Sequence, residues 1–473
     1  MKKDKFKQYA PYITGYGIMI ILYFILHMCV RALSRDDIFF ANQLNNESLI
    51  SFLSYRYVNW TSRIGIEAIL VLITRLPIMV WRILDILMIV ILTFGTGIII
   101  NKTGEKKYSL LSLPVMMMVP VEVMYSAGEM ATTINYLWPA ALGIYAASFL
   151  FRNIRGIKVK AYEYIFIYLS LIFALFNEQI TVIYFVATGL FILVDVIKSI
   201  KEKKKPSLSV HWYVFFILSI LGILLVVTCP GNANRTAIEA GLNFPGWENV
   251  TLIEKFGMGF LQAVTFPMLS TETNFLFFFT TLSILYINIT KKKKYIYIIA
   301  SLFPMVLPTL SLIEKILSMA HINITFGVTY FMSNVDLPSM SDVPMIHVII
   351  EVLIYLFYIT CTIVGIVGVF SKGKEENVVI TTQNTCPLYT QRIIAILLLC
   401  AAFCSRMLTG FSPTVYVSFH RTAIIECILI ALLNGYLLCF YNADEDEKNK
   451  KQKRIINIIA IILGLVTVLK PMI

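Results

Sequence analysis

Apolar runs long enough to cross a membrane recur along the whole chain. A helix needs roughly 20 mostly apolar residues to span the hydrocarbon core of a bilayer. Of the 473 residues, 58% are hydrophobic and only 14% are charged, whereas about 25% of the residues of a soluble domain are charged. The runs therefore predict an all-α polytopic membrane protein in which residues 1–473 form a single integral membrane domain.

The basic residues predict how the chain threads the membrane. Clusters of Lys and Arg recur at every second loop between apolar runs, which is the bias of a cytoplasmic membrane face. Alternation from a cytoplasmic N-terminus predicts about 13 spans and an extracytoplasmic C-terminus in a multi-pass protein of the cell membrane. The predicted spans are residues 11–30, 78–100, 109–125, 137–151, 162–177, 179–197, 210–228, 274–290, 295–313, 346–370, 393–408, 422–441 and 455–470. This distribution accounts for the formal net charge of +12 without a nucleic-acid partner.

A shorter apolar run lies in the first long loop. Residues Ile64–Ile73 are mostly apolar, but a run of this length is too short to cross a bilayer. Counting it as a span would also place Lys102, Lys106 and Lys107 outside, against the charge bias. We therefore expect an interfacial or re-entrant helix here. The long loops 31–77, 229–273 and 314–345 are predicted to be extracytoplasmic, with juxtamembrane helices.

Two adjacent acids, Asp36 and Asp37, follow the first predicted span in the stretch SRDDIFF. A rigid span would hold them close to the membrane surface. Arg35 beside them can pair with them or bind a phosphate, for which the planar guanidinium is well suited. Although an ordinary solvated loop start is the alternative, we expect at least one of the two acids to be catalytic.

Further polar residues from distant parts of the chain fall on the same predicted outer face. Each of them alone is often a cap, a turn or a snorkelling side chain. Their restriction to one face favours a shared cavity. The candidate substrate-binding residues are Arg35, Arg63, Glu129, Asn135, Tyr136, Glu178, Asn234, Arg235, His420 and Arg421.

Other charges lie within the predicted spans. Arg82 and Asp85 are three residues apart on one helical face, and this spacing predicts that they pair. Glu351, Arg406 and Glu426 lie near the ends of their spans. Ionisable residues in spans usually face a cavity, and snorkelling to the membrane surface is the alternative.

The order of features resembles the GT-C superfamily of membrane glycosyltransferases. The shared features are an acidic motif at the outer end of the first span and a large first loop with a juxtamembrane helix. More narrowly, DDIFF, NWTSR, GEMATTINYLW, FNEQ and CPGNANR are similar to motifs of a family of uncharacterised bacterial polytopic proteins. That family is related to glucosyltransferases that decorate surface polysaccharides. The resemblance covers about residues 31–235, and the remainder only by topology.

The resemblance implies a hexosyltransferase of the GT-C type. Its donor would be a sugar on a polyprenyl phosphate, and its acceptor a cell-surface polysaccharide or glycolipid. Asp36 or Asp37 would be the general base, and Arg63 and Arg235 would neutralise the leaving lipid phosphate. The residues expected to bind sugar hydroxyls are Glu129, Asn135, Tyr136 and Glu178. No cofactor is required, although the acidic pair would permit a divalent cation.

Two other functions stay open. A polysaccharide polymerase or ligase has similar size and outer loops, and usually relies on several outer arginines in place of an acid. A lipid-linked sugar transporter or flippase would show internal repeats and broken helices near the midplane, and we find no convincing repeat. The chain has no nucleotide-binding loop and no serine-hydrolase motif, and an enzyme that acts outside the cell would have no nucleotide sugars to bind.

Overall fold

The structure, a computed structural model, is all-helical over the residues that it describes. These are residues 2–101, 109–125, 128–270, 272–333, 345–371, 388–418, 420–443 and 449–472. Ten helices in them are long and apolar enough to cross a membrane, and the number rises to 11 if a bent helix pair counts as one span. The prediction of an all-α multi-pass membrane protein is confirmed, with fewer spans in these residues than the predicted number.

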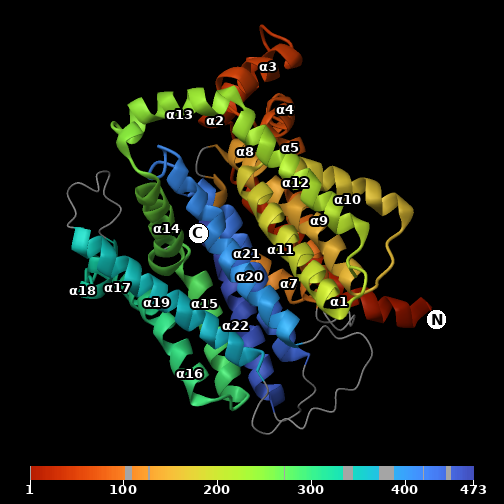
Figure 1. Cartoon of the computed structure of the whole chain (residues 1–473), viewed down its shortest axis with the longest axis vertical. Coiled ribbons are helices and arrows are strands. Elements are labelled where there is room, and N and C mark those ends of the chain that lie inside the picture. The colour runs from red at the N-terminus through yellow and green to blue at the C-terminus, as the bar shows by residue number, and fades with distance from the viewer. Residues whose placement is uncertain are drawn as a thin grey trace.

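Two groups of helices lie side by side around a central helix (Figure 1). The first group comprises α1 (Lys2–Met28), α5 (Ile78–Ile100), α9 (Trp138–Ile154), α10 (Ala161–Ala174), α11 (Glu178–Glu202) and α12 (Val210–Thr228). The second comprises α14 (Leu252–Leu269), α15 (Asn274–Thr290), α16 (Tyr295–Leu302), α17 (Val306–Met319), α18 (Gly327–Ser333), α19 (Met345–Val369), α20 (Leu388–Met407) and α22 (Lys450–Leu469). In the central helix α21 (Ile424–Asn442), 17 of the 19 residues are buried. It is apolar on nearly every side, as a helix surrounded by other helices should be.

Four shorter helices lie across one end of the bundle (Figure 1). They are α2 (Asp36–Gln43), α3 (Leu49–Asn59), α4 (Ile64–Ile73) and α13 (Pro230–Asn243), and we call this end the cap end. Helix α4 has the bounds of the short apolar run in the sequence. Helix α13 begins directly against the end of α3, because a Cβ atom added to Gly231 would lie 2.4 Å from the backbone nitrogen of Trp60.

Three predicted spans differ from the observed helices. Residues 109–125 contain α7 (Ser112–Met117) and η1 (Val121–Tyr125), both too short to span. The chain breaks between them at Pro120, which has no amide hydrogen for a helix and disfavours helical geometry before it. In place of the predicted span 162–177, the structure has a helix of only 14 residues, α10. The predicted span 274–290 has the bounds of α15, but α15 is bent by 78° against α14. Helix α14 lies within the predicted loop 229–273, where no span was expected.

The charges within the spans have specific partners. Asp85 accepts a hydrogen bond from Trp138 at 2.6 Å and lies 2.8 Å from His27. Because Arg82 instead donates to the carbonyl of Val30, the predicted Arg82–Asp85 pair is wrong.

Two more of these charges, Arg406 and Glu426, lie 3.5 Å apart and are both fully buried, and Glu351 is buried as well. Snorkelling is therefore excluded for these three residues. The basic residues Lys102, Lys106 and Lys107, and residues 334–344 of the predicted loop 314–345, lie outside the described residues.

Candidate functional site

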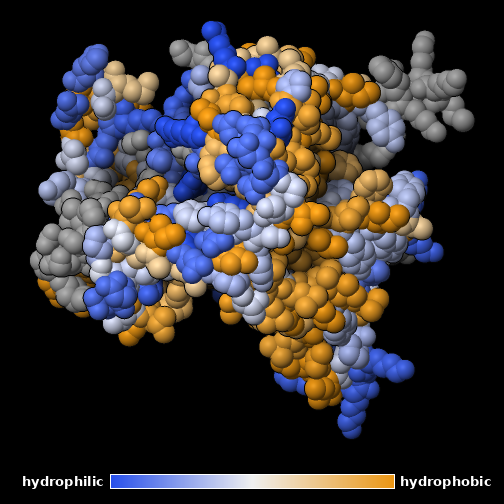
Figure 2. Space-filling model, turned by 90° about the horizontal axis from the view of Figure 1, so that it is seen from above, coloured by the Kyte–Doolittle hydropathy of each residue, from blue (hydrophilic) through white to orange (hydrophobic). Residues whose placement is uncertain are grey.

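A polar cavity of about 240 Å³ lies at the cap end. Seen from this end, hydrophilic residues gather near the middle of the molecule, beside broad hydrophobic surfaces (Figure 2). Six predicted site residues line the cavity, namely Asp36, Arg63, Asn135, Tyr136, Arg235 and Arg421. They come from α2, the start of α4, η2 (Thr133–Leu137), α13 and η7 (Arg421–Ala423). The fold thus brings together residues that are almost 400 positions apart in the chain.

On one side of the cavity, Arg63 is held by short hydrogen bonds. Its Nε atom donates to the two carboxylate oxygens of Glu178 at 3.0 and 2.8 Å, and its Nη2 atom lies 2.7 Å from the same carboxylate. The guanidinium also lies 5.1 Å from the ring of Tyr136. Burial alone would lower the pKa of Arg63, but Glu178 and Tyr136 together raise the pKa above its usual value. Arg63 is therefore a fixed positive charge in the cavity wall.

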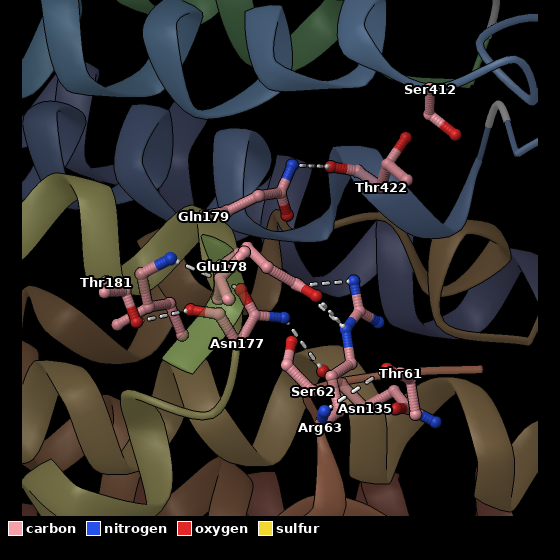
Figure 3. A network of polar contacts seen from close by, with 12 residues as sticks. Thr61, Ser62, Arg63, Asn135, Asn177, Glu178, Gln179, Thr181, Ser412 and Thr422 are labelled. Carbon is pink, nitrogen blue, oxygen red and sulfur yellow. Dashed lines mark hydrogen bonds and ion pairs between the residues drawn. The ribbon is translucent and has the colours of Figure 1, made fainter. Parts of the chain in front are cut away.

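The segment Asn177–Gln179 holds Glu178 in position (Figure 3). Asn177 caps α11 by accepting a hydrogen bond from the amide of Ile180 and donates to the carbonyl of Asn135 at 3.0 Å. Gln179 donates to the carbonyls of Ser405 and Thr422, at the ends of the α20–α21 hairpin. Three consecutive polar residues thus connect α11 to both halves of the bundle, and the Glu178 carboxylate faces Arg63.

A second buried arginine pair, Arg56 with Glu67, was not among the predicted site residues. Arg56 donates from Nε and Nη2 to the two oxygens of Glu67 at 2.6 Å each. The rings of Phe39, Phe40, Phe52 and Trp60 lie 5.4–6.0 Å from its guanidinium. The pair connects α3 to α4 in the wall of the cavity. The signal in the sequence is Glu67 itself, a single acid in an otherwise apolar run.

Two other arginines of the cavity wall have only long contacts with acids. Arg421 Nη1 lies 3.6 Å from the carboxylate of Asp36, and Arg235 Nε lies 3.9 Å from that of Glu239. Arg235 also lies 5.7 Å from the ring of Trp60. Burial and the nearby Arg63 lower the pKa of Arg235, although a guanidinium stays charged at neutral pH. Arg235 and Arg421 are therefore cations without a tightly bound counter-ion.

The two adjacent acids point to different places. The Asp36 side chain lines the cavity and is 54% exposed. Asp37 is buried and accepts a hydrogen bond from the amide of Ala131 at 2.7 Å, at the start of α8 (Glu129–Thr132). Burial raises the pKa of Asp37 to about 6, although the amides of Ala131 and Met130 act against this shift. Asp37 connects α2 to α8, and Asp36 is the acid available to a ligand.

Gly128 makes this connection possible. Its φ of 112° lies in a region that L side chains rarely adopt, and an added Cβ atom would lie 2.8 Å from Oδ1 of Asp37. The glycine therefore allows the chain before α8 to pass directly over the buried carboxylate.

The remaining predicted residues do not line the cavity. Glu129 accepts a hydrogen bond from Ser34 at 2.7 Å, and Asn234 donates to the carbonyl of Val58 at 3.0 Å. His420 Nδ1 lies 2.8 Å from the carboxylate of Glu272. Arg35 precedes α2 with a φ of 47°. Within the described parts of the chain, no three His, Cys, Asp or Glu side chains are grouped as metal ligands, so we derive no step through a divalent cation.

An apolar groove of about 150 Å³ runs along the interior of the bundle. It is lined by α9 and α11 of the first group and by α20 and the central helix α21. On α11 the lining residues extend from Ile180 to Phe191, a length of about 16 Å at the helical rise. Ile180 lies two positions after Glu178, the partner of Arg63. The groove therefore begins within one helical turn of the carboxylate residue that binds Arg63.

Comparisons with protein-family models, with curated proteins and with solved structures find no match to this chain. The GT-C resemblance therefore stays a prediction from short motifs. The residues of the polar cavity and the apolar groove carry the functional inference.

Proposed function

We propose that the protein is a membrane glycosyltransferase that moves a sugar from a polyprenyl-phosphate donor to an acceptor hydroxyl in the polar cavity. The observation that carries this proposal is that the apolar groove begins within one helical turn of Glu178, the partner of the cavity residue Arg63. A water-soluble substrate would need only the cavity, whereas a lipid-linked phosphate needs both an apolar channel and cations at its end. The acceptor would be a polysaccharide or glycolipid on the outer face, so the cap end would face outward.

Arg235 and Arg421 are the best candidates for binding the phosphate. Arg63, which the family resemblance assigns to this role, already has Glu178 as a bidentate partner. The long contacts of Arg235 and Arg421 leave their N–H groups available for phosphate oxygens. Charge-assisted bonds from a guanidinium to phosphate are short, and often bidentate.

Asp36 would act as the general base of the transfer. It would take the proton from the acceptor hydroxyl, and the oxygen would use the freed electron pair to form a bond to the anomeric carbon of the donor. The bond from that carbon to the phosphate oxygen would break, and its electron pair would stay on the phosphate. Arg235 and Arg421 would stabilise this added negative charge, and Asp36 would then release its proton to water.

Asn135 and Thr132 are polar side chains of the cavity wall without charge. Asn135 donates to the carbonyl of Ala131, which leaves its amide oxygen as an acceptor for a sugar hydroxyl. With Tyr136 beside Arg63, this wall offers hydrogen-bonding groups on the side of the cavity opposite α13.

A transporter or flippase of lipid-linked sugars is the second candidate. The bend of 78° between α14 and α15 favours it, because broken helices are common in transporters. A transporter would move the lipid-linked sugar without consuming it, whereas a transferase would release the lipid phosphate.

The test compares lipid extracts and surface polysaccharides of a parent strain with those of a deletion strain. The deletion strain would be complemented with the wild-type protein, with Asp36→Asn or with Glu202→Gln. Glu202 is an exposed acid at the end of α11 far from the cavity. We expect the deletion and Asp36→Asn strains to lose a sugar from the polysaccharide and to accumulate its lipid-linked form, because a positioned base contributes about 10²–10⁴-fold to rate. Normal modification with Asp36→Asn would contradict the proposal.

A further inference from the structure

We infer that Asp36 and the donor phosphate compete for Arg421, so that binding of the donor releases the base. This inference rests on the proposed function and adds an order of events to it. Donor binding would come first, and only then could Asp36 accept the proton of the acceptor hydroxyl.

The resting contacts of Arg421 support this competition. One guanidinium nitrogen, Nη1, lies 3.6 Å from the Asp36 carboxylate, and the other, Nη2, donates to Ser418 at 3.2 Å. Arg421 is the only basic side chain of the described residues within ion-pair distance of Asp36. In the absence of a donor, the Asp36 carboxylate is therefore the ion-pair partner of Arg421.

The other arginines of the cavity cannot take this role. Arg56 and Arg63 each make bonds of 3.0 Å or less to a carboxylate, and releasing either would leave a partly buried acid without its partner. Arg421 would lose only one long contact to a half-exposed acid. A phosphate offers Arg421 shorter, charge-assisted bonds than Asp36 does.

The position of Arg421 also suits a shared phosphate. Arg63, Arg235 and Arg421 line the same cavity as Tyr136, and we take the space between the three guanidiniums as the point at which a phosphate would bind. A phosphate at that point would draw Arg421 towards Arg235 and away from Asp36. Its negative charge would also offset the repulsion between Arg63 and Arg235.

The experiment is a double-mutant cycle on binding, with no dependence on turnover. The probe is a polyprenyl monophosphate, titrated against the full chain in lipid nanodiscs and followed by the fluorescence of Trp60 and the other tryptophans. The proteins are wild type, Asp36→Asn, Arg421→Gln and the double variant. Glu122→Gln is the matched control, since Glu122 is a half-buried acid that pairs with Lys470 and does not line the cavity.

We expect Asp36→Asn to tighten binding by about two- to fivefold, the scale of one exposed ion pair. In the Arg421→Gln background the same change should have no effect, and Glu122→Gln should have no effect in either background. If Arg421→Gln fails to fold, Arg421→Lys is used in its place, because lysine keeps the charge but cannot make the bidentate bonds of a guanidinium. In that background, the gain in affinity from Asp36→Asn should be smaller than in the wild type.

Equal effects of Asp36→Asn in both backgrounds, or weaker binding, would overturn the inference and leave the proposed function standing. Absence of binding by the wild-type protein would overturn both.

Discussion

Two pairs of arginines in the wall of the polar cavity are held in different ways. Arg56 and Arg63 each form bidentate bonds of 2.6–3.0 Å with Glu67 and Glu178. By contrast, Arg235 and Arg421 are 3.9 and 3.6 Å from their nearest carboxylates. The two short pairs connect helices and have a structural role. The long contacts leave two cations available, which is what a binding site for an anion requires.

The largest effect expected from this difference is on stability. Glu67→Ala would leave Arg56 charged, buried and without a partner, and removing one member of a buried pair costs about 3–5 kcal/mol. Glu239→Ala should cost less than about 1 kcal/mol, because the contact of Glu239 with Arg235 is long. Thermal unfolding of both variants in the same detergent measures the two costs. Similar losses of stability in the two variants would show that the short and the long arginine–carboxylate contacts contribute equally to stability.

The next effect concerns binding and turnover. Arg235→Lys and Arg421→Lys should each lower kcat/KM by about 10–100-fold, the value of one charge-assisted hydrogen bond, while thermal stability stays close to that of the wild type. Arg63→Lys should lower stability as well, because it loses the bidentate bond to Glu178. A lysine variant of Arg421 with full activity would remove the phosphate-binding role from that residue.

A smaller effect concerns Asp37 and pH. The folded protein holds the Asp37 proton more tightly than the unfolded chain does, because burial raises the pKa from 3.8 to about 6. The stabilising contribution is therefore complete below pH 3.8 and is lost as the pH rises towards 6. Between these values the unfolding temperature of the wild type should fall more steeply than that of Asp37→Asn, which cannot ionise. Parallel curves would show that Asp37 is solvated.

The sequence predicted the class of fold because the length and composition of an apolar run are local properties. Helix α4 has the predicted bounds for the same reason. The number of spans was less predictable, since Pro120 divides one run, α10 is shorter than its run suggests, and α15 is bent against α14. The predicted Arg82–Asp85 pair failed because the rule of neighbours along a helix assumes an exposed surface. In the bundle, Asp85 instead contacts His27 and Trp138, which belong to other helices.

The candidate site was predictable in part. Asp36, Arg63, Arg235 and Arg421 lie at the ends of apolar runs, and alternation across a membrane places such ends on one face. The partners within the site were not predictable. Arg63 and Glu178 are 115 residues apart, and no spacing in the sequence encodes that contact. Glu67 was not predicted as a site residue, because only the length of the apolar run around it was used and the run does not show that Glu67 contacts Arg56.

The most direct test of the central claim is an experimental structure of the protein with a polyprenyl monophosphate bound. The account predicts a phosphate within 3.5 Å of the guanidiniums of Arg235 and Arg421 (roughly the limit of a hydrogen bond), with Asp36 no longer in contact with Arg421. The isoprenoid chain should lie in the apolar groove along α11, from Ile180 towards Phe191. A phosphate bound away from both arginines, or a chain bound outside the groove, would contradict the account.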